Sequence, residues 1–399
     1  MKRIARGFLL VPAFVLLLIL RLVRPIFRVE LCVVAFHRFG HLALEPELFL
    51  SIRDFESKLK NRKKFPPKLL LWSIGPKRAQ ANKFLGAFWQ NELKACPSLF
   101  VSSFLKVGSM FQPLKLPEND LSIHGPQNAL DRAPTHLRIR QSEENAGRQL
   151  CEELEIDVSK PIVCLVNRHA AHYASLGQPE GVGYSNINFD ISIFELTVKR
   201  LISRGYQVVR MGAGSEEPLR IDAYGFTDYA TSSARSDFLD VYLASKASFA
   251  VSTQTGPDAL CLAFRKPVCY IDTARFSHMF LGTQLATWNP VQILQHGERM
   301  SLKQIASSEI AWIDDLADFD RLDVEIIRSS AKTIEQYVVG YINLYEKNFM
   351  LNTLERELST TANLILAKGL GERGRLRFGD VTASFNPVFL TENADWYLV

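Results

Sequence analysis

Short apolar runs alternate with segments of helical character along most of this chain. Continuous apolar runs bounded by Gly, Pro or polar residues are typical of strands buried on both faces of a parallel sheet. Runs of this kind predict strands at residues 29–36, 69–74, 99–105, 162–166, 206–211, 249–252 and 267–271. The segments between and after them predict helices at residues 47–60, 84–93, 141–154, 190–204, 237–246, 258–264 and 331–368. Strands that alternate with helices predict an α/β fold with a parallel, doubly wound sheet.

The length of 399 residues favours more than one domain, because a single hydrophobic core rarely serves so long a chain. The polar segment DVSKP at residues 157–161 lies between two predicted elements and marks the expected boundary. We therefore predict α/β domains at residues 29–157 and 158–330, followed by helices and a tail at residues 331–399. Residues 106–140 are rich in Pro, Gly and polar residues, which predicts an irregular loop.

The first 28 residues combine a long apolar run with an unbalanced positive charge. Residues 8–20 are thirteen residues without a charge, whereas a helix that spans a bilayer needs about 20. Six basic residues and no acid flank this run, and no small-residue site for signal cleavage follows it. We expect residues 1–28 to form a membrane-associating helix, peripheral or single-pass, at the anionic cytoplasmic face of the inner membrane. A helix buried in the protein core is the alternative, and it fits so basic a terminus poorly.

The rest of the chain is about neutral, because the net charge is +5 and six positive charges lie in the first 28 residues. A neutral body argues against a nucleic-acid-binding surface. The six cysteines show no C-x-x-C metal spacing, and Cys32, Cys164 and Cys269 lie within apolar runs as small core residues. This use of cysteine predicts neither a metal site nor a disulfide framework, and it fits a reducing compartment.

Four loops that follow predicted strands hold polar residues and glycines. They are HRFGHL at residues 37–42, NRHAAHY at residues 167–173, RMGAG at residues 210–214 and STQTGPD at residues 252–258. The carboxyl ends of parallel strands meet at one edge of a sheet, where open α/β folds bind their ligands. Glycine lets the backbone approach a ligand closely, and arginine supplies a forked donor for phosphate. These loops therefore predict a cleft between the two domains for a ligand that bears a diphosphate.

Several specific motifs are missing from these loops. RMGAG does not meet the GxGxxG dinucleotide pattern, and the chain holds neither a P-loop nor a G-x-S-x-G elbow. His169 and His172 have no HExxH motif beside them, so we predict no metal site. Asp237 and Asp240 precede or open a predicted helix, and they are either ligand contacts or carboxylates that stabilise the helix N-terminus.

The order of these segments resembles a family of bacterial glycosyltransferases associated with surface-polysaccharide loci. The resemblance rests on NRHAAHY, YSNINFDI, LISRGYQVVRMG and SDFLDVYLASKASFAVSTQTGPDALCLAFRKPV, and on FHRFGHLALEPELFL in the first domain. It implies a GT-B fold of two Rossmann-like doubly wound domains that face a cleft, a nucleotide-sugar donor, and no metal or other cofactor. The arginine at a strand end and the Ser/Thr-Gly loop are also similar to the donor sites of fucosyltransferase-like enzymes.

On this basis we place the donor on the second domain and the acceptor, a lipid-linked or polysaccharide chain, on the first. Arg168 and Arg210 are expected near the diphosphate, where positive charge stabilises the leaving group. The predicted donor-binding residues are Arg168, His169, Arg210, Gly212, Ser252, Thr253, Thr255, Gly256 and Asp258. The predicted acceptor or cleft residues are Arg38, Gly40, Tyr184, Asn186, Asp237 and Asp240.

His41 is the candidate general base for the acceptor hydroxyl, because histidine titrates near neutral pH. The alternative is a loop histidine that caps or packs, and His37 and His169 are further candidates for the base.

Two departures from the family pattern favour other functions. His169 follows Arg168 where the family has Asp, and Ser185 stands between Tyr184 and Asn186 where the family has Arg. A degenerate GT-B scaffold for polysaccharide assembly is therefore one alternative. A sugar-nucleotide epimerase of the same fold is another, but it needs neither an acceptor nor a membrane helix.

Overall fold

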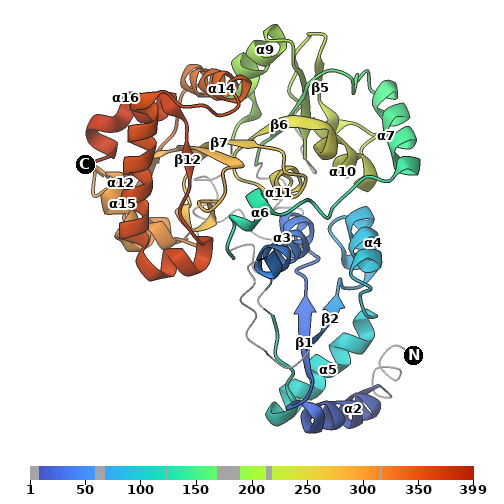
Figure 1. Ribbon diagram of the computed structural model, residues 1–399. Coiled ribbons are helices and arrows are strands. Elements are labelled where there is room, and N and C mark those ends of the chain that lie inside the picture. Colours follow the sequence, from blue (N-terminus) through green and yellow to red (C-terminus); the bar gives the residue numbers. More distant parts are fainter. Residues whose placement is uncertain are drawn as a thin grey trace. The chain divides into compact units, whose positions relative to one another are not determined.

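The computed structural model describes residues 9–58, 68–119, 121, 125–168, 189–212, 218–314 and 317–399. The chain divides into two compact units, Met1–Ile123 and His124–Val399. Figure 1 shows the elements of both units, coloured along the chain. The domain boundary expected near residue 157 stays a prediction.

The first unit contains two parallel strands, β1 (Arg28–Val33) and β2 (Lys68–Ser73). Both come from apolar runs that predicted strands, and Leu31 of β1 forms one further parallel bridge to Glu118. Helices and 3-10 turns surround them: α2 (Leu10–Val23), α3 (Phe39–Lys58), η1 (Lys77–Ala79), α4 (Lys83–Glu92), α5 (Ser98–Met110) and η2 (Gln112–Leu114). Since the described residues of this unit form a sheet of these two strands, a doubly wound sheet here stays a prediction.

The strand predicted at residues 99–105 is wrong, because these residues belong to helix α5. Val101, Phe104 and Val107 are buried at intervals of three residues, which is a helical spacing. A short apolar run is shared by buried strands and buried helices, so the run alone could not separate them. The irregular loop predicted at residues 106–140 is also only partly correct, since α5 continues to Met110 and α6 (Ala129–Arg132) lies within it.

Helix α2 packs on α5 through one face. Ala13 and Leu17 are buried in a cluster with Val101, Phe104 and Val107 of α5. The apolar run near the N-terminus therefore forms a helix, as expected, and this helix is packed against protein on one side. Within the described residues, no helix combines the length and the apolar character that a membrane crossing requires.

The second unit is built on a seven-stranded parallel sheet with the order β12-β8-β7-β6-β3-β4-β5. The strands are β3 (Ile162–Val166), β4 (Gln207–Met211), β5 (Phe226–Thr227), β6 (Ala247–Ser252), β7 (Val268–Thr273), β8 (Ala286–Pro290) and β12 (Ser384–Phe385). The chain starts in the middle at β3, reaches one edge at β5, and returns beside β3 with β6. This reversal defines a doubly wound sheet, which confirms the parallel α/β fold predicted for this part of the chain.

Helices pack around this sheet, and further helices follow along the chain toward the C-terminus (Figure 1). They are α6, α7 (Gln141–Glu153), α9 (Glu195–Ser203), α10 (Asp237–Lys246), α11 (Asp258–Ala263), α12 (Leu302–Ala306), α13 (Ala317–Arg321), α14 (Ala331–Glu346), α15 (Thr353–Phe378) and α16 (Pro387–Tyr397). Short 3-10 turns are η4 (Ile191–Phe194), η5 (Tyr229–Thr231), η6 (Phe276–His278) and η7 (Glu309–Trp312). A small antiparallel sheet holds β10 (Glu298–Arg299), β9 (Gln292–Gln295) and β11 (Val324–Ile327), in that order.

The core of this unit is formed by strands that are buried along their whole length. All residues of β3, β4, β7 and β8 are buried, as expected for a parallel sheet covered on both faces. The rings of Tyr270 and Trp288 stack on neighbouring strands at a centroid distance of 4.1 Å. Phe249 of β6 packs edge-on against Tyr341 of α14 at 5.2 Å. Aromatic packing on both sides of the sheet thus fixes the strands whose ends form the candidate site.

Helix α7 packs against α10 through a glycine. A Cβ atom at Gly147 would overlap the ring of Tyr242 in α10. This ring is held in place, because Tyr242 Oη donates to Glu144 Oε1 at 3.1 Å and Lys246 Nζ lies 5.1 Å from the ring centroid. Lys246 is itself paired with Glu144 at 2.7 Å.

We expect Gly147→Ala to destabilise the protein by about 1–2 kcal/mol. Overpacking against the fixed ring costs ~1–3 kcal/mol, which outweighs the gain of up to ~1 kcal/mol from helix propensity. Urea unfolding followed by circular dichroism measures the change. Asn145→Ala, at an exposed position of the same helix, is the control and is expected to be neutral or stabilising. A Gly147→Ala variant as stable as the wild type would contradict the tight packing.

Candidate functional site

The strand order places a switch point between β3 and β6. From β3 the chain proceeds to β4 on one side, and it later returns to β6 on the other side. Ligands of open α/β sheets bind outside the carboxyl ends of the strands at this point. Residues 167–168 follow β3, and residues 253–257 follow β6, so the two loops singled out in the sequence flank the switch point.

Direct contacts join the ends of β3 and β6. The backbone N–H of Arg168 donates to Thr253 Oγ1 at 2.8 Å, and Thr253 N donates to the Val166 carbonyl at 3.1 Å. The Arg168 guanidinium donates through Nη2 to the carbonyl of Gln254 at 3.2 Å. Arg168 is half-buried, so the second loop fixes the place of its guanidinium at the edge of the sheet.

Asp258, at the start of α11, supports the loop after β6. Its Oδ2 accepts from Ser252 Oγ at 2.6 Å and from the backbone N–H of Thr255 at 2.8 Å. Ser252 Oγ in turn accepts from Gln254 N at 3.1 Å, which holds Gln254 at a φ of +62°. The Asp258 side chain is only 4% exposed, so it supports the loop from inside. Burial raises the pKa of the Asp258 carboxyl to about 6, although both hydrogen bonds act in the opposite direction.

Arg275 follows β7, at the same edge of the sheet as Arg168 and Gln254. Gln254 Nε2 donates to the Arg275 carbonyl at 3.4 Å, and Arg275 Nη1 donates to the Asp314 carbonyl at 3.4 Å. Arg168, Gln254 and Arg275 thus follow the ends of the neighbouring strands β3, β6 and β7. The sequence prediction missed Arg275, although it lies after a predicted strand in the same way as Arg168 does.

A third arginine, Arg328, reaches the same edge from β11. Its guanidinium lies 4.0 Å from the centroid of the Phe189 ring, and Phe189 N donates to the Arg168 carbonyl at 3.2 Å. Burial lowers the pKa of Arg328, and the nearby Asp272 carboxylate acts in the opposite direction. Asp272 accepts from Ser329 N at 2.8 Å and Ser329 Oγ at 2.7 Å. No sequence pattern singled out Arg328, because it follows a strand of the small antiparallel sheet.

Arg210 of β4 is buried in an ion pair. Its side chain is 1% exposed, and its Nη1 lies 2.9 Å from Asp228 Oδ2, after β5. Asp228 Oδ2 also accepts from Leu219 N at 2.8 Å. Gly212 follows β4 at a φ of +150°, a conformation that favours glycine. The ion pair accounts for the burial of Arg210, and a donor contact by Arg210 or Gly212 stays a prediction.

Asp237 and Asp240 lie in the first turn of α10. The cap of this helix is Ser236, whose side chain accepts from Leu239 N at 3.2 Å. Asp240 is buried and pairs with Arg235 Nη1 at 3.0 Å, and burial raises the pKa of Asp240. Asp237 is half-buried in a first turn that favours acidic residues. Both positions therefore have a structural explanation, and the ligand role stays a prediction.

In the first unit, His41 forms a hydrogen-bonded pair with Glu45 on α3. His41 Nδ1 lies 2.7 Å from Glu45 Oε1, and Glu45 Oε2 accepts from Ala35 N at 2.8 Å, just beyond β1. The His41 side chain is 27% exposed, and the carboxyl is 7% exposed. A carboxylate that accepts from Nδ1–H orients the ring and leaves Nε2 as the free acceptor.

The strand-end loop predicted at residues 37–42 is shorter than expected, because α3 begins at Phe39. Gly40 and His41 thus lie in the first turn of a helix. Arg38 is exposed in the turn before it. The helix starts earlier than expected because the apolar side chains of the run FGHLALE already follow the helical period that continues in the later residues of α3.

His169, Tyr184 and Asn186 lie outside the described residues. Within the part of the chain that is described, no group of three or more His, Cys, Asp or Glu side chains could hold a metal ion.

No family model matches this chain, and no curated protein matches it. Solved structures are similar at low identity. The glycosyl transferase family 9 from Veillonella parvula DSM 2008 shares 8% identity, covers 61% of this chain and 80% of its own, and has a TM-score of 0.34. The ADP-heptose LPS heptosyltransferase II of E. coli shares 12% identity, with coverages of 68% and 92% and a TM-score of 0.38. The dodecameric iron-containing heptosyltransferase TibC, in complex with ADP-D-beta-D-heptose, shares 15% identity, with coverages of 81% and 77% and a TM-score of 0.32. TM-scores this low do not establish a common fold, so the function has to be inferred from the residues of this chain.

We expect the buried Asp258 to make stability depend on pH. Its pKa of about 6 lies above the ordinary value of 3.8, so the protonated carboxyl is favoured in the folded state. This contribution is fully present below about pH 4 and is lost as the pH rises through about 6, a loss of ~2–3 kcal/mol. Asp258→Asn keeps an oxygen for Ser252 and Thr255 but cannot ionise. Relative to this variant, the wild type should lose that amount between about pH 4 and pH 7.

Urea unfolding at both pH values measures the difference. Asp320→Asn, at an exposed position of α13, is the control and should leave the pH dependence as in the wild type. An equal gap between the wild type and Asp258→Asn at both pH values would contradict a raised pKa.

Proposed function

We propose that this protein is a GT-B-type glycosyltransferase that moves a sugar from a nucleotide-sugar donor to a lipid-linked or surface-polysaccharide acceptor, without a bound metal ion. One observation carries the proposal. Arginines and hydroxyl-bearing residues gather at the carboxyl edge of a doubly wound parallel sheet, on both sides of its switch point. The sequence resemblance to bacterial glycosyltransferases agrees with it.

The chemistry of this edge suits a diphosphate. Arg168 follows β3 and Arg275 follows β7, the strands on either side of β6. Both present guanidinium groups, which bind phosphate oxygens through forked hydrogen bonds. Thr253 and Thr255 add hydroxyl groups on the loop between them. As the bond between the anomeric carbon and the diphosphate oxygen breaks, the bonding electrons leave with the diphosphate. Fixed positive charges that face this oxygen stabilise the developing charge, the function that a metal ion has in other transferases.

His41 is the proposed base for the acceptor. The acceptor hydroxyl oxygen forms the new bond to the anomeric carbon, and its proton passes to Nε2 of His41. Glu45 holds Nδ1–H and stabilises the imidazolium ion that results, while the Ala35 amide fixes Glu45. General base catalysis of this kind contributes typically ~10²–10⁴-fold to a rate.

We expect the protein to bind one class of nucleotide, and Arg168→Gln or Arg275→Gln to weaken this binding at least ~10-fold. Loss of a charge-assisted hydrogen bond costs ~1.5–3 kcal/mol, and each 1.4 kcal/mol is tenfold. A thermal-shift screen with ADP, UDP, GDP, CMP and dTDP and their sugars identifies the ligand, because binding to the folded state raises the Tm. Titration calorimetry then gives Kd for each variant.

Arg356→Gln, at an exposed arginine of α15, is the matched control and should bind as the wild type does. The absence of any shift with folded wild-type protein would overturn the proposed transferase and favour a degenerate scaffold.

We expect His41→Gln to lower kcat by at least ~10²-fold and to leave the Kd of the donor unchanged, because the base acts on the acceptor and not on the donor. Release of nucleotide from the identified donor, with acceptor lipid or with water, measures turnover. His296→Gln is the matched control, since His296 Nδ1 also pairs with a carboxylate, Asp323, at 2.7 Å but at an exposed position. Wild-type turnover in His41→Gln would rule out His41 as the base.

A further inference from the structure

Helix α2 has one packed face and one apolar face that is exposed. Ala13 and Leu17 are buried against α5. On the opposite side of the helix, five large apolar residues are each at least 42% exposed: Val11, Val15, Leu18, Ile19 and Leu22. Ile26, just beyond the helix, is 77% exposed. These six exposed residues are called the α2 face, and the helical spacing of the first five puts them on one side of α2.

The α2 face is a continuous apolar stripe on the surface. Scattered apolar side chains on a surface are normal, but a continuous apolar stripe marks a site of interaction. Further apolar side chains lie beside it, since the Phe14 ring of α2 meets the Phe111 ring at 5.1 Å, and Phe111 and Met110 are themselves exposed. The end of α5 therefore extends the exposed apolar surface.

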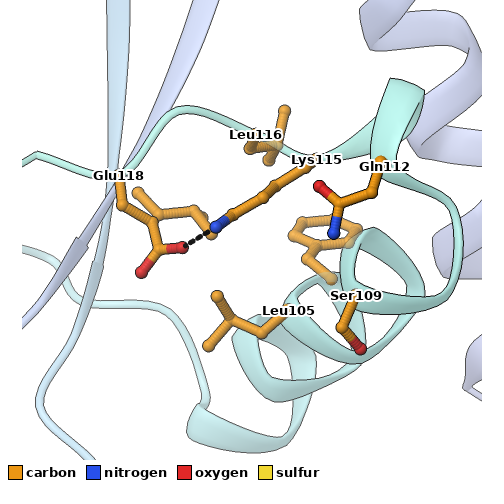
Figure 2. A pocket seen from close by; sticks show the side chains of 8 residues that line it. Leu105, Ser109, Gln112, Lys115, Leu116 and Glu118 are labelled. Atoms are coloured by element: carbon orange, nitrogen blue, oxygen red, sulfur yellow. Dashed lines mark ion pairs between the residues drawn. The ribbon is translucent and has the colours of Figure 1, made fainter.

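Arginines stand beside the end of α2. Arg21, Arg24 and Arg28, together with Lys115, line a small hollow of about 20 Å³. Figure 2 shows Lys115 extended across a neighbouring cavity to Glu118, where the two charges lie 3.3 Å apart. Among the described residues these three arginines form no salt bridge, although Arg28 lies near the Glu30 carboxylate. Residues 1–29 contain no acid.

We propose that the α2 face and the three arginines Arg21, Arg24 and Arg28 bind the anionic surface of a phospholipid bilayer. The apolar face enters the boundary between headgroups and acyl chains, and the guanidinium groups bind lipid phosphates. The charge pattern selects this partner, because a purely apolar protein groove would not require three arginines beside it.

The packing of α2 also fixes how the helix meets the membrane. Since Ala13 and Leu17 are covered by α5, only the α2 face is available to lipid. The helix therefore lies in the plane of the interface, to a depth of ~5–10 Å. This inference goes beyond the proposed transferase and does not depend on donor binding.

Flotation of the full-length protein with lipid vesicles tests the proposal. The vesicles are phosphatidylcholine alone and phosphatidylcholine mixed with anionic phosphatidylglycerol. We expect the wild type to float with both and to prefer the anionic vesicles. Leu18→Ser/Leu22→Ser should lower the partition coefficient at least ~10-fold on both, because apolar burial is lost. Arg21→Gln/Arg24→Gln should lose ~5-fold for each charge on anionic vesicles only.

Matched controls come from exposed positions of α15: Leu364→Ser for the apolar change and Arg356→Gln/Arg375→Gln for the charges, both expected to float as the wild type does. The substituted side chains are exposed, and circular dichroism confirms that each variant is folded. The proposal is overturned if the wild type stays in solution with all vesicles, or if the α2 variants float as the wild type does. It is also overturned if light scattering without lipid shows an oligomer that Leu18→Ser/Leu22→Ser converts to monomer, since the face then binds a second copy. Failure here leaves nucleotide binding, and with it the transferase proposal, untouched.

Discussion

The proposed donor site depends on the hydrogen bonds that the buried carboxyl of Asp258 accepts. The loop after β6 turns sharply, with Gln254 at a φ of +62°, and the backbone N–H groups of Gln254 and Thr255 donate to side chains and not to the sheet. Asp258 accepts from the loop at Ser252 Oγ and at Thr255 N, and this satisfies groups that would otherwise be buried without a partner. A strained backbone of this kind persists only where the surroundings fix it, and such strain is concentrated at functional sites. This turn points the Gln254 carbonyl toward the Arg168 guanidinium, which donates a hydrogen bond to it.

The arginines of the edge are brought together by topology. Arg168, Arg275 and Arg328 follow β3, β7 and β11, elements far apart along the chain. Like charges at a half-buried edge repel one another unless acidic groups or carbonyls offset them. Here Asp272 lies near Arg328, and carbonyls of Gln254 and Asp314 accept from the other two. A diphosphate would add the negative charge that this arrangement favours. The contacts that hold each guanidinium would keep its orientation fixed when the diphosphate binds.

The sequence predicted those features that local chemistry determines. Continuous apolar runs located β3, β4, β6 and β7 to within about two residues, and α10 was predicted at its observed bounds. The short strands β5 and β12 and the small antiparallel sheet were not predicted, because their apolar runs are too short to be recognised. Residues 99–105 failed for another reason, since a short apolar run fits a strand and a helix equally well.

For the site, the chain order showed Arg168 and the loop at residues 252–258, each beside a strong strand signal. It could not show that Arg210 turns to Asp228, or that Arg328 reaches the ring of Phe189, because each is a contact between distant segments. The Glu45 partner of His41 lies four residues away on one helix face, a spacing that could have been read from the sequence had residues 37–42 not been taken for a loop.

The two proposed surfaces bind their ligands through different interactions, and this difference explains which residues form each surface. The edge of the sheet needs rigid donors, because an oxygen that gains charge during the reaction is stabilised only by groups already in position. The α2 face needs apolar area and positive charge but no fixed geometry, because a bilayer adapts to what it meets. The first unit carries both the α2 face and the His41–Glu45 pair, whereas the second unit carries the arginine edge. A lipid-linked acceptor would then be met by the unit proposed to bind the membrane, and a water-soluble donor by the unit built around the doubly wound sheet.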